Sequence, residues 1–202
     1  MIRAPAIAPT FAGRRPIIHI SERYMTRLTT LKPSEATGET AVVFDQIKTA
    51  IGKVPNAYAT IGTHSPAGLA AMLHVDAAIA ASSLEQADVE AVRLAVSALS
   101  GCDYCLAAHT MIGKMAGLAP DAMKHIRAGL PSGDTRRDAL LAFVRSIVTS
   151  RDTVPAAVLD AVLAAGFSER QVIETILVIT SITFTNLVNR VNDTTLDFPA
   201  VD

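Results

Sequence analysis

Apolar side chains recur at helical spacing along this chain, in segments separated by glycine and proline. In residues 34–51, for example, Val43, Ile47 and Ile51 lie four residues apart, which predicts an apolar helix face that ends near Gly52. Similar patterns predict helices over residues 55–61, 66–81, 83–99, 102–117, 120–129, 134–150, 155–166 and 168–191. No Asn-Gly or Asp-Gly hairpin turn separates alternating segments. We therefore expect an all-α fold of about eight helices in a single compact domain.

Serine and aspartate residues mark the predicted starts of several helices. Ser65 stands before a proline, which is the usual order of a cap and a first helical residue. Ser83 is followed three residues later by Gln86, which fits a capping box and predicts a helix that starts there. Asp134 and Ser168 are the expected caps of two later helices.

Composition narrows the class of protein. The chain has 202 residues, half of them hydrophobic, and a formal net charge of −1. Such a chain can bury a full core, and it has no basic surplus that would favour nucleic acid. The most apolar run, residues 176–188, is interrupted by five polar residues and is shorter than the roughly 20 residues of a membrane span. We expect a core helix there, no membrane partner and a cytoplasmic protein.

The N-terminal region has a different composition. Residues 1–27 carry five arginines against one acidic residue and show no helical stripe. They also lack the continuous apolar segment of a secretory signal. We predict that residues 1–26 form a disordered leader and that residues 27–202 form the helical domain. An organellar presequence, or a true start at Met25, is the alternative interpretation.

The two cysteines of the chain are Cys102 and Cys105, and His109 follows four residues after the second. On a helix, where each residue advances about 100°, these three side chains share one stripe. A thiolate in such a pair is a nucleophile and can close a disulfide, and the imidazole can take the thiol proton. Cys102 has the helix N-terminus and Cys105 has the base, so the spacing leaves open which cysteine attacks.

Glu90 is the candidate partner on the preceding segment. It lies twelve residues before Cys102 among small and apolar neighbours, so we expect it to be partly buried. The break at Gly101 lets its helix fold back toward the thiols. The alternative is a surface ion pair with Arg93, three residues away. Two other interpretations are a zinc site, with His109 and Glu90 as further ligands, and a pair of spectator thiols. The chain has no second Cys-x-x-Cys or His pair to complete a zinc site, so no metal or cofactor is expected.

Together, Glu90 and the run Cys102-x-Tyr104-Cys105-x-x-x-His109 resemble the signature of the AhpD-like alkylhydroperoxidases of the carboxymuconolactone decarboxylase family. The resemblance is strongest over residues 85–118. It implies an all-α domain that assembles into homo-oligomers, and a thiol peroxidase that uses neither haem nor flavin.

The same resemblance implies a role for each residue. Cys105 corresponds to the cysteine that attacks the peroxide and Cys102 to the resolving cysteine, while His109 and Glu90 fall on the proton-relay positions. Tyr104 stands where some members have a second histidine, and we expect it mainly to pack, with an auxiliary hydrogen bond as the alternative. The implied partners are a hydroperoxide substrate and a dithiol reductant, such as a lipoyl-bearing or thioredoxin-like protein.

Two other functions are compatible with the sequence. One is a decarboxylase of the same family that acts on a cyclic lactone acid, which would leave both thiols without a role. The other is a non-catalytic, redox-sensing oligomeric module. A polar stripe near the C-terminus, with Asn186, Asn189, Arg190 and Asn192 on an otherwise apolar helix, is expected to cap helices or to meet another subunit.

Overall fold

The computed structural model describes residues 26–201, and this part of the chain is helical throughout, without strands. The elements are η1 (Pro33–Glu35), α1 (Gly38–Ile51), α2 (Asn56–His64), α3 (Pro66–Ala80), α4 (Gln86–Ser100), α5 (Asp103–Met115), α6 (Pro120–Ala128), α7 (Thr135–Thr149), α8 (Ala156–Ala164) and α9 (Glu169–Asn192). The expected all-α fold is confirmed, with nine α-helices in the described part. The leader predicted for residues 1–26 lies outside it, except for its last residue.

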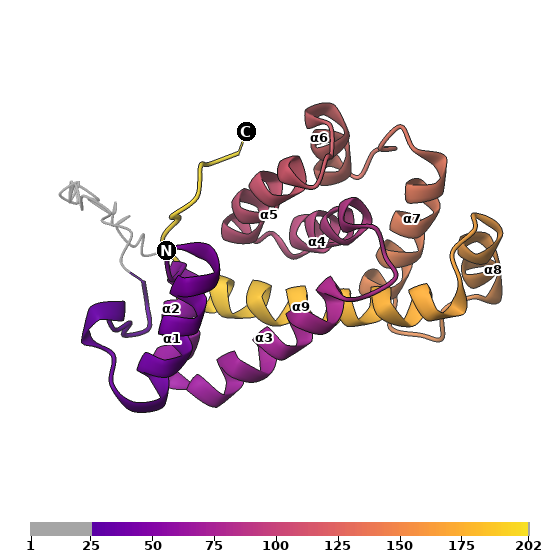
Figure 1. The fold of residues 1–202 in the computed structure, drawn as a ribbon. Helices are drawn as coiled ribbons and strands as arrows, with labels where there is room; N and C mark the ends of the chain where they lie inside the picture. Colours follow the sequence, from indigo (N-terminus) through magenta and orange to yellow (C-terminus); the bar gives the residue numbers. More distant parts are fainter. Residues whose placement is uncertain (1–25, 202) are drawn as a thin grey trace, which may run out of the picture.

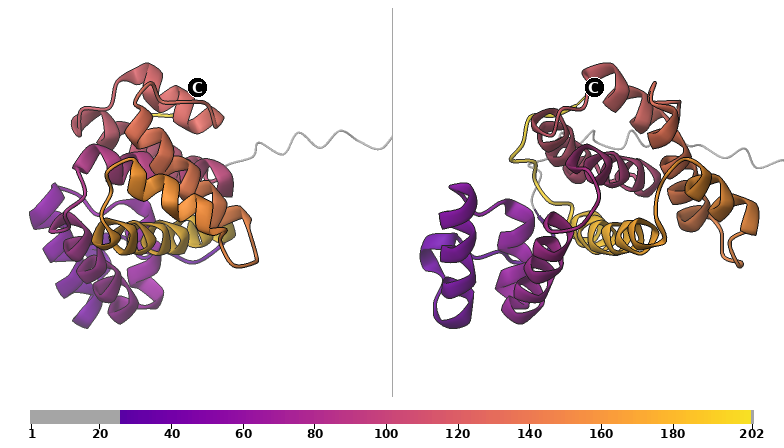
Figure 2. Two further views of the ribbon diagram at one scale, coloured as in Figure 1. Left: turned by 90° about the vertical axis from the view of Figure 1, so that its right-hand side faces the viewer. Right: turned by 45° about the vertical axis from the view of Figure 1, so that its right-hand side comes forward.

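Helix α9 crosses the whole molecule. Figure 1 shows α4 and α5 on one side of it and α3 on the other, with α1 and α2 gathered near one end and α7 and α8 near the other. Figure 2 views the same arrangement along directions in which α9 is foreshortened, and α4 again lies next to it. Because α9 packs against α2, α3, α4, α5 and α7, it connects the two ends of the fold.

Helix α4 is the most enclosed element, packed against α5, α6, α7 and α9. Val89, Val92 and Val96 point into the core shared with α7 and α9. Ala91 and Leu94 point into a second core with α6. Since opposite faces of the helix are both covered, a polar side chain on α4 is also buried and needs an internal partner.

Three of the predicted caps are confirmed. The Ser65 side chain accepts a hydrogen bond at the start of α3, and that of Asp134 does so at the start of α7. Ser168 and Gln171 form a reciprocal capping box at the start of α9. These caps satisfy backbone N–H groups that have no partner within their own helices.

The capping box predicted at Ser83 is wrong. The N-cap of α4 is Glu85, and the helix begins at Gln86. The Ser83 hydroxyl instead donates to the Glu174 carboxylate on α9, with an Oγ–Oε2 distance of 2.6 Å. A partner distant in sequence thus took the side chain away from the helix start, which a local pattern does not reveal.

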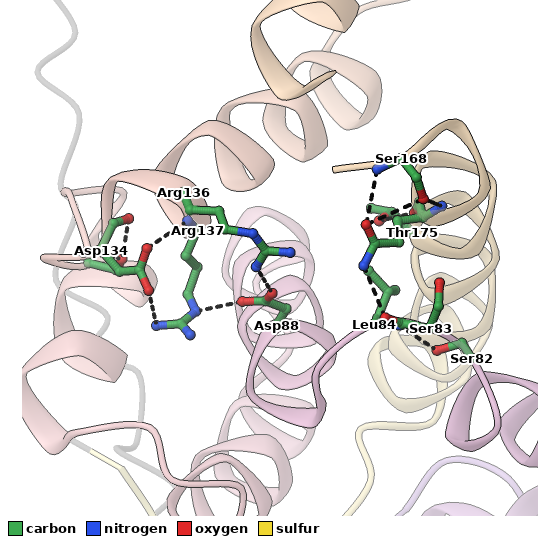
Figure 3. A network of polar contacts seen from close by, with 11 residues as sticks. Ser82, Ser83, Leu84, Asp88, Asp134, Arg136, Arg137, Ser168 and Thr175 are labelled. Carbon is green, nitrogen blue, oxygen red and sulfur yellow. Dashed lines mark hydrogen bonds and ion pairs between the residues drawn. The ribbon is translucent and has the colours of Figure 1, made fainter. Parts of the chain in front are cut away.

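The first turn of α4 is fixed by a buried carboxylate (Figure 3). Asp88 is fully buried, and its two oxygens lie 2.8 Å from Arg136 Nη1 and 2.9 Å from Arg137 Nε at the start of α7. Arg137 also pairs with Asp134 at 3.5 Å. This cluster, which we call the Asp88 clamp, holds α4 against α7.

Helix α9 is long and apolar enough to cross a membrane by length and composition, and no other helix within residues 26–201 is. Its packing against five neighbours agrees with the core helix predicted for residues 176–188. It also buries Asn186, Asn189 and Asn192 completely or nearly so. Buried amides with internal partners are typical of a helix packed within a protein.

Candidate active site

The dithiol lies at the tight turn between α4 and α5. Gly101 follows α4 with φ of 62°, a left-handed conformation that glycine adopts without strain. Cys102 is then the N-cap of α5, and Cys105 lies in its first turn. The break at Gly101 folds α5 back against α4, as the sequence predicted, so residues of both helices face each other.

Both cysteines are free thiols and both are buried, with 2% and 3% of their surface exposed. The two sulfur atoms are hydrogen bonded to each other. This bond lowers the pKa of Cys102 against the opposing effect of burial, and the same bond together with burial raises the pKa of Cys105. In the reduced pair the first charge therefore forms on Cys102, with the proton kept on Cys105.

Helix α9 supplies the other contacts of Cys105. Asn189 Nδ2 donates to Cys105 Sγ at 3.3 Å, whereas the Thr185 hydroxyl donates to the Ile182 carbonyl oxygen at 3.0 Å. Both side chains lower the pKa of Cys105 in opposition to the effects of Cys102 and of burial. Negative charge thus has polar neighbours at either sulfur atom.

Glu90 and His109 form a buried pair across α4 and α5. Glu90 is fully buried, and its Oε2 lies 2.8 Å from His109 Nδ1. Burial raises the pKa of Glu90, but the hydrogen bond and charge of His109, together with Arg93, outweigh it and leave the pKa lowered. An ionised carboxylate can only accept, so Nδ1 carries the hydrogen of this bond and Nε2 is the ring nitrogen left for proton exchange.

Arg93 extends this pair toward α3 and α9. Its Nη1 lies 2.8 Å from Glu90 and its Nη2 lies 3.0 Å from Asp76, which also accepts from the Ser181 hydroxyl at 2.9 Å. The Glu90–Arg93 ion pair weighed in the sequence analysis does form, but it is buried and it coexists with the His109 contact. The sequence had not indicated Asp76 or Ser181.

The structure joins the predicted residues into two pairs. Cys102 bonds to Cys105, and Glu90 bonds to His109. None of the hydrogen bonds described within residues 26–201 joins the imidazole to a thiol. Burial and then the charge of Asp76 raise the pKa of the Tyr58 phenol on α2 to about 12, and charges on Cys105 and Glu90 add smaller contributions.

Tyr104 takes a structural position. Its hydroxyl accepts from the Ala57 backbone N–H at 3.2 Å and donates to Asp197 at 2.6 Å. Its ring packs edge to face with Phe198, with ring centres 5.5 Å apart. Tyr104 therefore connects α5 to α2 and to the C-terminal segment, in agreement with the packing role that we expected for it.

A cavity of about 520 Å³ opens beside the dithiol. Its walls come from the α4–α5 turn, the end of α9 and the segment that follows α9. They are formed by Gly101, Cys102, Asp103, Tyr104, Asn189, Arg190, Asp193, Thr194, Thr195 and Leu196. Cys102 contributes to this wall and Cys105 does not. The Arg190 charge also lowers the pKa of Cys102, after larger effects from Cys105, burial and Asp103.

Sequence reasoning missed two residues of the site. Tyr58 lies on a helix whose pattern indicated only packing, and nothing local marked it. Asn189 was noted as part of a polar stripe, but it was expected to cap a helix or to meet another subunit. A buried asparagine on an apolar helix was the available signal, and its partner Cys105 is 84 residues away. Within residues 26–201, no three His, Cys, Asp or Glu side chains group as they would around a metal ion.

Comparison with known proteins connects part of this chain with a protein family. Residues 66–130, which contain Glu90 and the dithiol, match the model of the carboxymuconolactone decarboxylase family. No curated protein matches the chain. The fold matches that of a peroxidase-related AhpD core protein from Ralstonia eutropha JMP134, with a TM-score of 0.76, 18% identity, and coverage of 86% of this chain and 93% of that one.

Two further solved structures share the fold. A peroxidase-related protein from Silicibacter sp. TM1040 has a TM-score of 0.70 at 19% identity, covering 85% of this chain and 93% of that one. The debrominase Bmp8 in its apo form has a TM-score of 0.70 at 22% identity, with coverage of 85% and 92%. The family match covers the dithiol segment, residues 66–130, and the shared fold covers most of the chain, so this protein has an AhpD-like fold with a carboxymuconolactone decarboxylase family segment around the dithiol.

Proposed function

We propose that this protein is a thiol-dependent peroxidase that reduces organic hydroperoxides and is recycled by an external dithiol. The observation that carries the proposal is a buried dithiol at the start of α5, the helix whose His109 pairs with Glu90 of α4. A decarboxylase would leave the dithiol unexplained. A purely structural pair would not need a charged carboxylate buried behind a histidine.

The first step oxidises one cysteine. His109, oriented by Glu90, takes the proton of Cys105, directly or through a water molecule. The sulfur atom attacks the terminal oxygen of the hydroperoxide, the S–O bond forms, and the O–O bond breaks. The leaving alkoxide takes the proton from His109 and departs as an alcohol. Cys105 becomes a sulfenic acid, and the peroxide has received two electrons.

The second stage restores the dithiol. Cys102 attacks the sulfur of the sulfenic acid, water leaves, and a Cys102–Cys105 disulfide forms. An external dithiol then reduces this disulfide by exchange and becomes a disulfide itself. The lowered pKa of Cys102 favours this role, because the resolving sulfur must also react as a thiolate.

The opposite order of attack is the main competing mechanism. Cys102 lines the cavity and holds the charge of the resting pair, whereas the family resemblance gives the attack to Cys105. The proton of the Cys105 thiol lies in the bond between the sulfurs, so its transfer moves the charge from one cysteine to the other. The two mechanisms differ in the cysteine that becomes a sulfenic acid.

Intact mass measurement tests both the function and the order. Reduced wild type and the Cys102→Ser and Cys105→Ser variants are each mixed with a small excess of cumene hydroperoxide. We expect wild type to lose two hydrogens within seconds, Cys102→Ser to gain one oxygen, and Cys105→Ser to stay unmodified. Oxygen gain only in Cys105→Ser would assign the attack to Cys102. Reaction no faster than that of free cysteine would overturn the peroxidase function.

Reductive debromination by the same dithiol is the second candidate. It is favoured by the cavity at Cys102, and by the similarity of fold to a debrominase whose cysteine-to-alanine variant was solved with tribromopyrrole. In this reaction the dithiol becomes a disulfide, bromide leaves, and the ring carbon receives a proton. Bromide release from tribromopyrrole by the reduced protein, in an assay parallel to the peroxide assay, separates the two functions.

We also propose that the protein self-associates through the outer face of α9. This face carries an exposed apolar stripe of Ile173, Ile176, Phe184, Leu187 and Val191. Successive members are three, eight, three and four residues apart, which keeps them on one side of the helix over five turns, with the exposed Thr180 between the two halves. Exposed apolar side chains along one helix face are typical of a protein interface.

A second copy of this chain is the occupant that the charges favour. When two α9 stripes meet in antiparallel orientation about residue 182, Glu174 comes to lie opposite Arg190. Sedimentation of wild type should give an oligomer, and Leu187→Lys should dissociate it while helicity stays unchanged. A monomeric wild type at micromolar concentration would contradict this assembly.

A further inference from the structure

Three asparagines on α9 are buried at successive turns, and one of them differs from the others. Asn186 and Asn192 are both fully buried, and both have their amide oxygen and nitrogen hydrogen bonded within the chain. Their partners are Ser97 and Ser100 for Asn186, and the Leu28 N–H, Thr60 and Thr194 for Asn192. These two side chains have the complete bonding that a buried amide needs.

Asn189 lies between them and is 4% exposed. Its Nδ2 donates to Cys105 Sγ at 3.3 Å, but its Oδ1 is buried without a hydrogen-bond partner among residues 26–201. A buried acceptor left unpaired costs about 1–3 kcal/mol of stability. The same helix satisfies its other two buried amides, so the unpaired oxygen is specific to this position.

The place of Asn189 indicates what the free oxygen does. The residue forms part of the wall of the 520 Å³ cavity, together with Cys102 and Arg190. Its amide nitrogen therefore lies on the Cys105 sulfur, and its oxygen is buried and unpaired within a residue of the cavity wall. A ligand that enters this cavity and donates a hydrogen bond would complete the amide.

We propose that Asn189 is a substrate-binding residue whose Oδ1 accepts a hydrogen bond from the terminal O–H of the hydroperoxide. This inference rests on the proposed peroxidase function and deepens it. The terminal oxygen is the atom that the sulfur attacks, and it keeps its hydrogen when the O–O bond breaks and the S–O bond forms. Asn189 thus holds the same O–H group before the attack, as peroxide, and after it, as sulfenic acid.

The proposal predicts a preference among substrates. Hydroperoxides have the O–H donor, whereas dialkyl peroxides do not. A dialkyl peroxide has no O–H group to donate, so its binding leaves the Asn189 oxygen unpaired. The site should therefore bind dialkyl peroxides less well than hydroperoxides. The same amide nitrogen stabilises negative charge on Cys105, and the test must separate this effect from binding.

The kinetic test compares two reagents and two variants. Reduced wild type, Asn189→Ala and Thr185→Ala are each mixed with cumene hydroperoxide and, separately, with an aromatic disulfide. A thiolate attacks the disulfide too, but the disulfide has no hydrogen to donate to Asn189. Thr185 also lowers the pKa of the Cys105 thiol, but it is not among the residues that line the cavity, so it is the matched control. We expect Asn189→Ala to lose about tenfold in the peroxide rate relative to the disulfide rate, and Thr185→Ala to change both rates equally.

If Asn189→Ala lost equal rate with both reagents, Asn189 would act only by stabilising the Cys105 thiolate, and the proposal would be overturned. A separate measurement needs neither a variant nor peroxide chemistry. The alcohol in which CH₂ replaces the inner peroxide oxygen of cumene hydroperoxide, and its methyl ether, are titrated into reduced wild type by calorimetry. We expect the alcohol to bind about tenfold more tightly. Equal affinities would overturn the proposal, whereas tighter alcohol binding by a protein inert to peroxide would refute only the peroxidase function.

Discussion

Helix α4 buries two carboxylates that stand two residues apart and have different surroundings. Asp88 and Glu90 are both fully buried. Asp88 is held by two arginines, whose charge is permanent. Glu90 is held by Arg93 and by His109, an imidazole that can accept and release a proton. A carboxylate between fixed charges can only stabilise the fold, whereas one that orients an imidazole can also support proton transfer.

Asp88 and Glu90 have different partners because different helices cover the two faces of α4 from which they project. The Asp88 clamp faces α7, where the partner arginines lie at a helix start away from the cavity. Glu90 faces His109 of α5, the helix that begins with the dithiol. Two similar residues on one helix therefore have different functions because different helices cover them. The following experiments are designed to separate these functions.

The largest effect is expected from removing the charge of the clamp. Asp88→Asn leaves two guanidinium groups without their buried counter-charge, and it should cost about 3 kcal/mol of unfolding free energy. Chemical denaturation of the variant and wild type measures the difference. The rate of disulfide formation with peroxide should stay unchanged per folded molecule. A loss of rate without a loss of stability would show that the clamp takes part in the chemistry.

Glu90→Gln should instead affect the reaction rate more than the stability. The amide keeps the size of the side chain but no longer stabilises a charged His109, so the rate of peroxide-dependent disulfide formation should fall by about 100-fold. Arg93 retains Asp76 as a partner, so the loss of stability should be smaller than in Asp88→Asn. Stopped-flow kinetics under single-turnover conditions measures the rate. An unchanged rate would exclude Glu90 from the relay.

The smallest effect is expected from acid pH, which should lower the unfolding free energy through the protonation of Glu90. The pKa of Glu90 is lowered from 4.5 in the folded protein, so its contribution to stability is full above that value and is lost as the pH falls through the folded pKa. Unfolding free energies measured between pH 5 and 2.5 should fall by up to about 1.4 kcal/mol per pH unit for this one proton. Glu90→Gln should remove that part of the slope, and equal slopes in both proteins would contradict the lowered pKa.

The accuracy of the sequence predictions follows the distance between interacting residues. Ser168 and Gln171 are three residues apart, and their capping box was predicted correctly. Ser83 had the same pattern, yet its hydroxyl bonds to Glu174, 91 residues away. The Glu90–His109 contact spans 19 residues; the Gly101 break predicted that the two consecutive helices fold back on each other, and the family resemblance implied the pairing itself. The Asn189–Cys105 contact spans 84 residues, and no pattern connected the two.

By itself, the sequence determined the helical character of the chain, the approximate bounds of its helices, the dithiol at the start of one helix and the nearby Glu90 and His109. Periodicity, caps and helical spacing are local properties, and they were sufficient for these features. Only the tertiary structure decided which thiol lines the cavity, which amide reaches Cys105, and which buried carboxylate meets a histidine. These features depend on how α9, α5 and α7 pack around α4, and packing brings together side chains that the sequence keeps far apart.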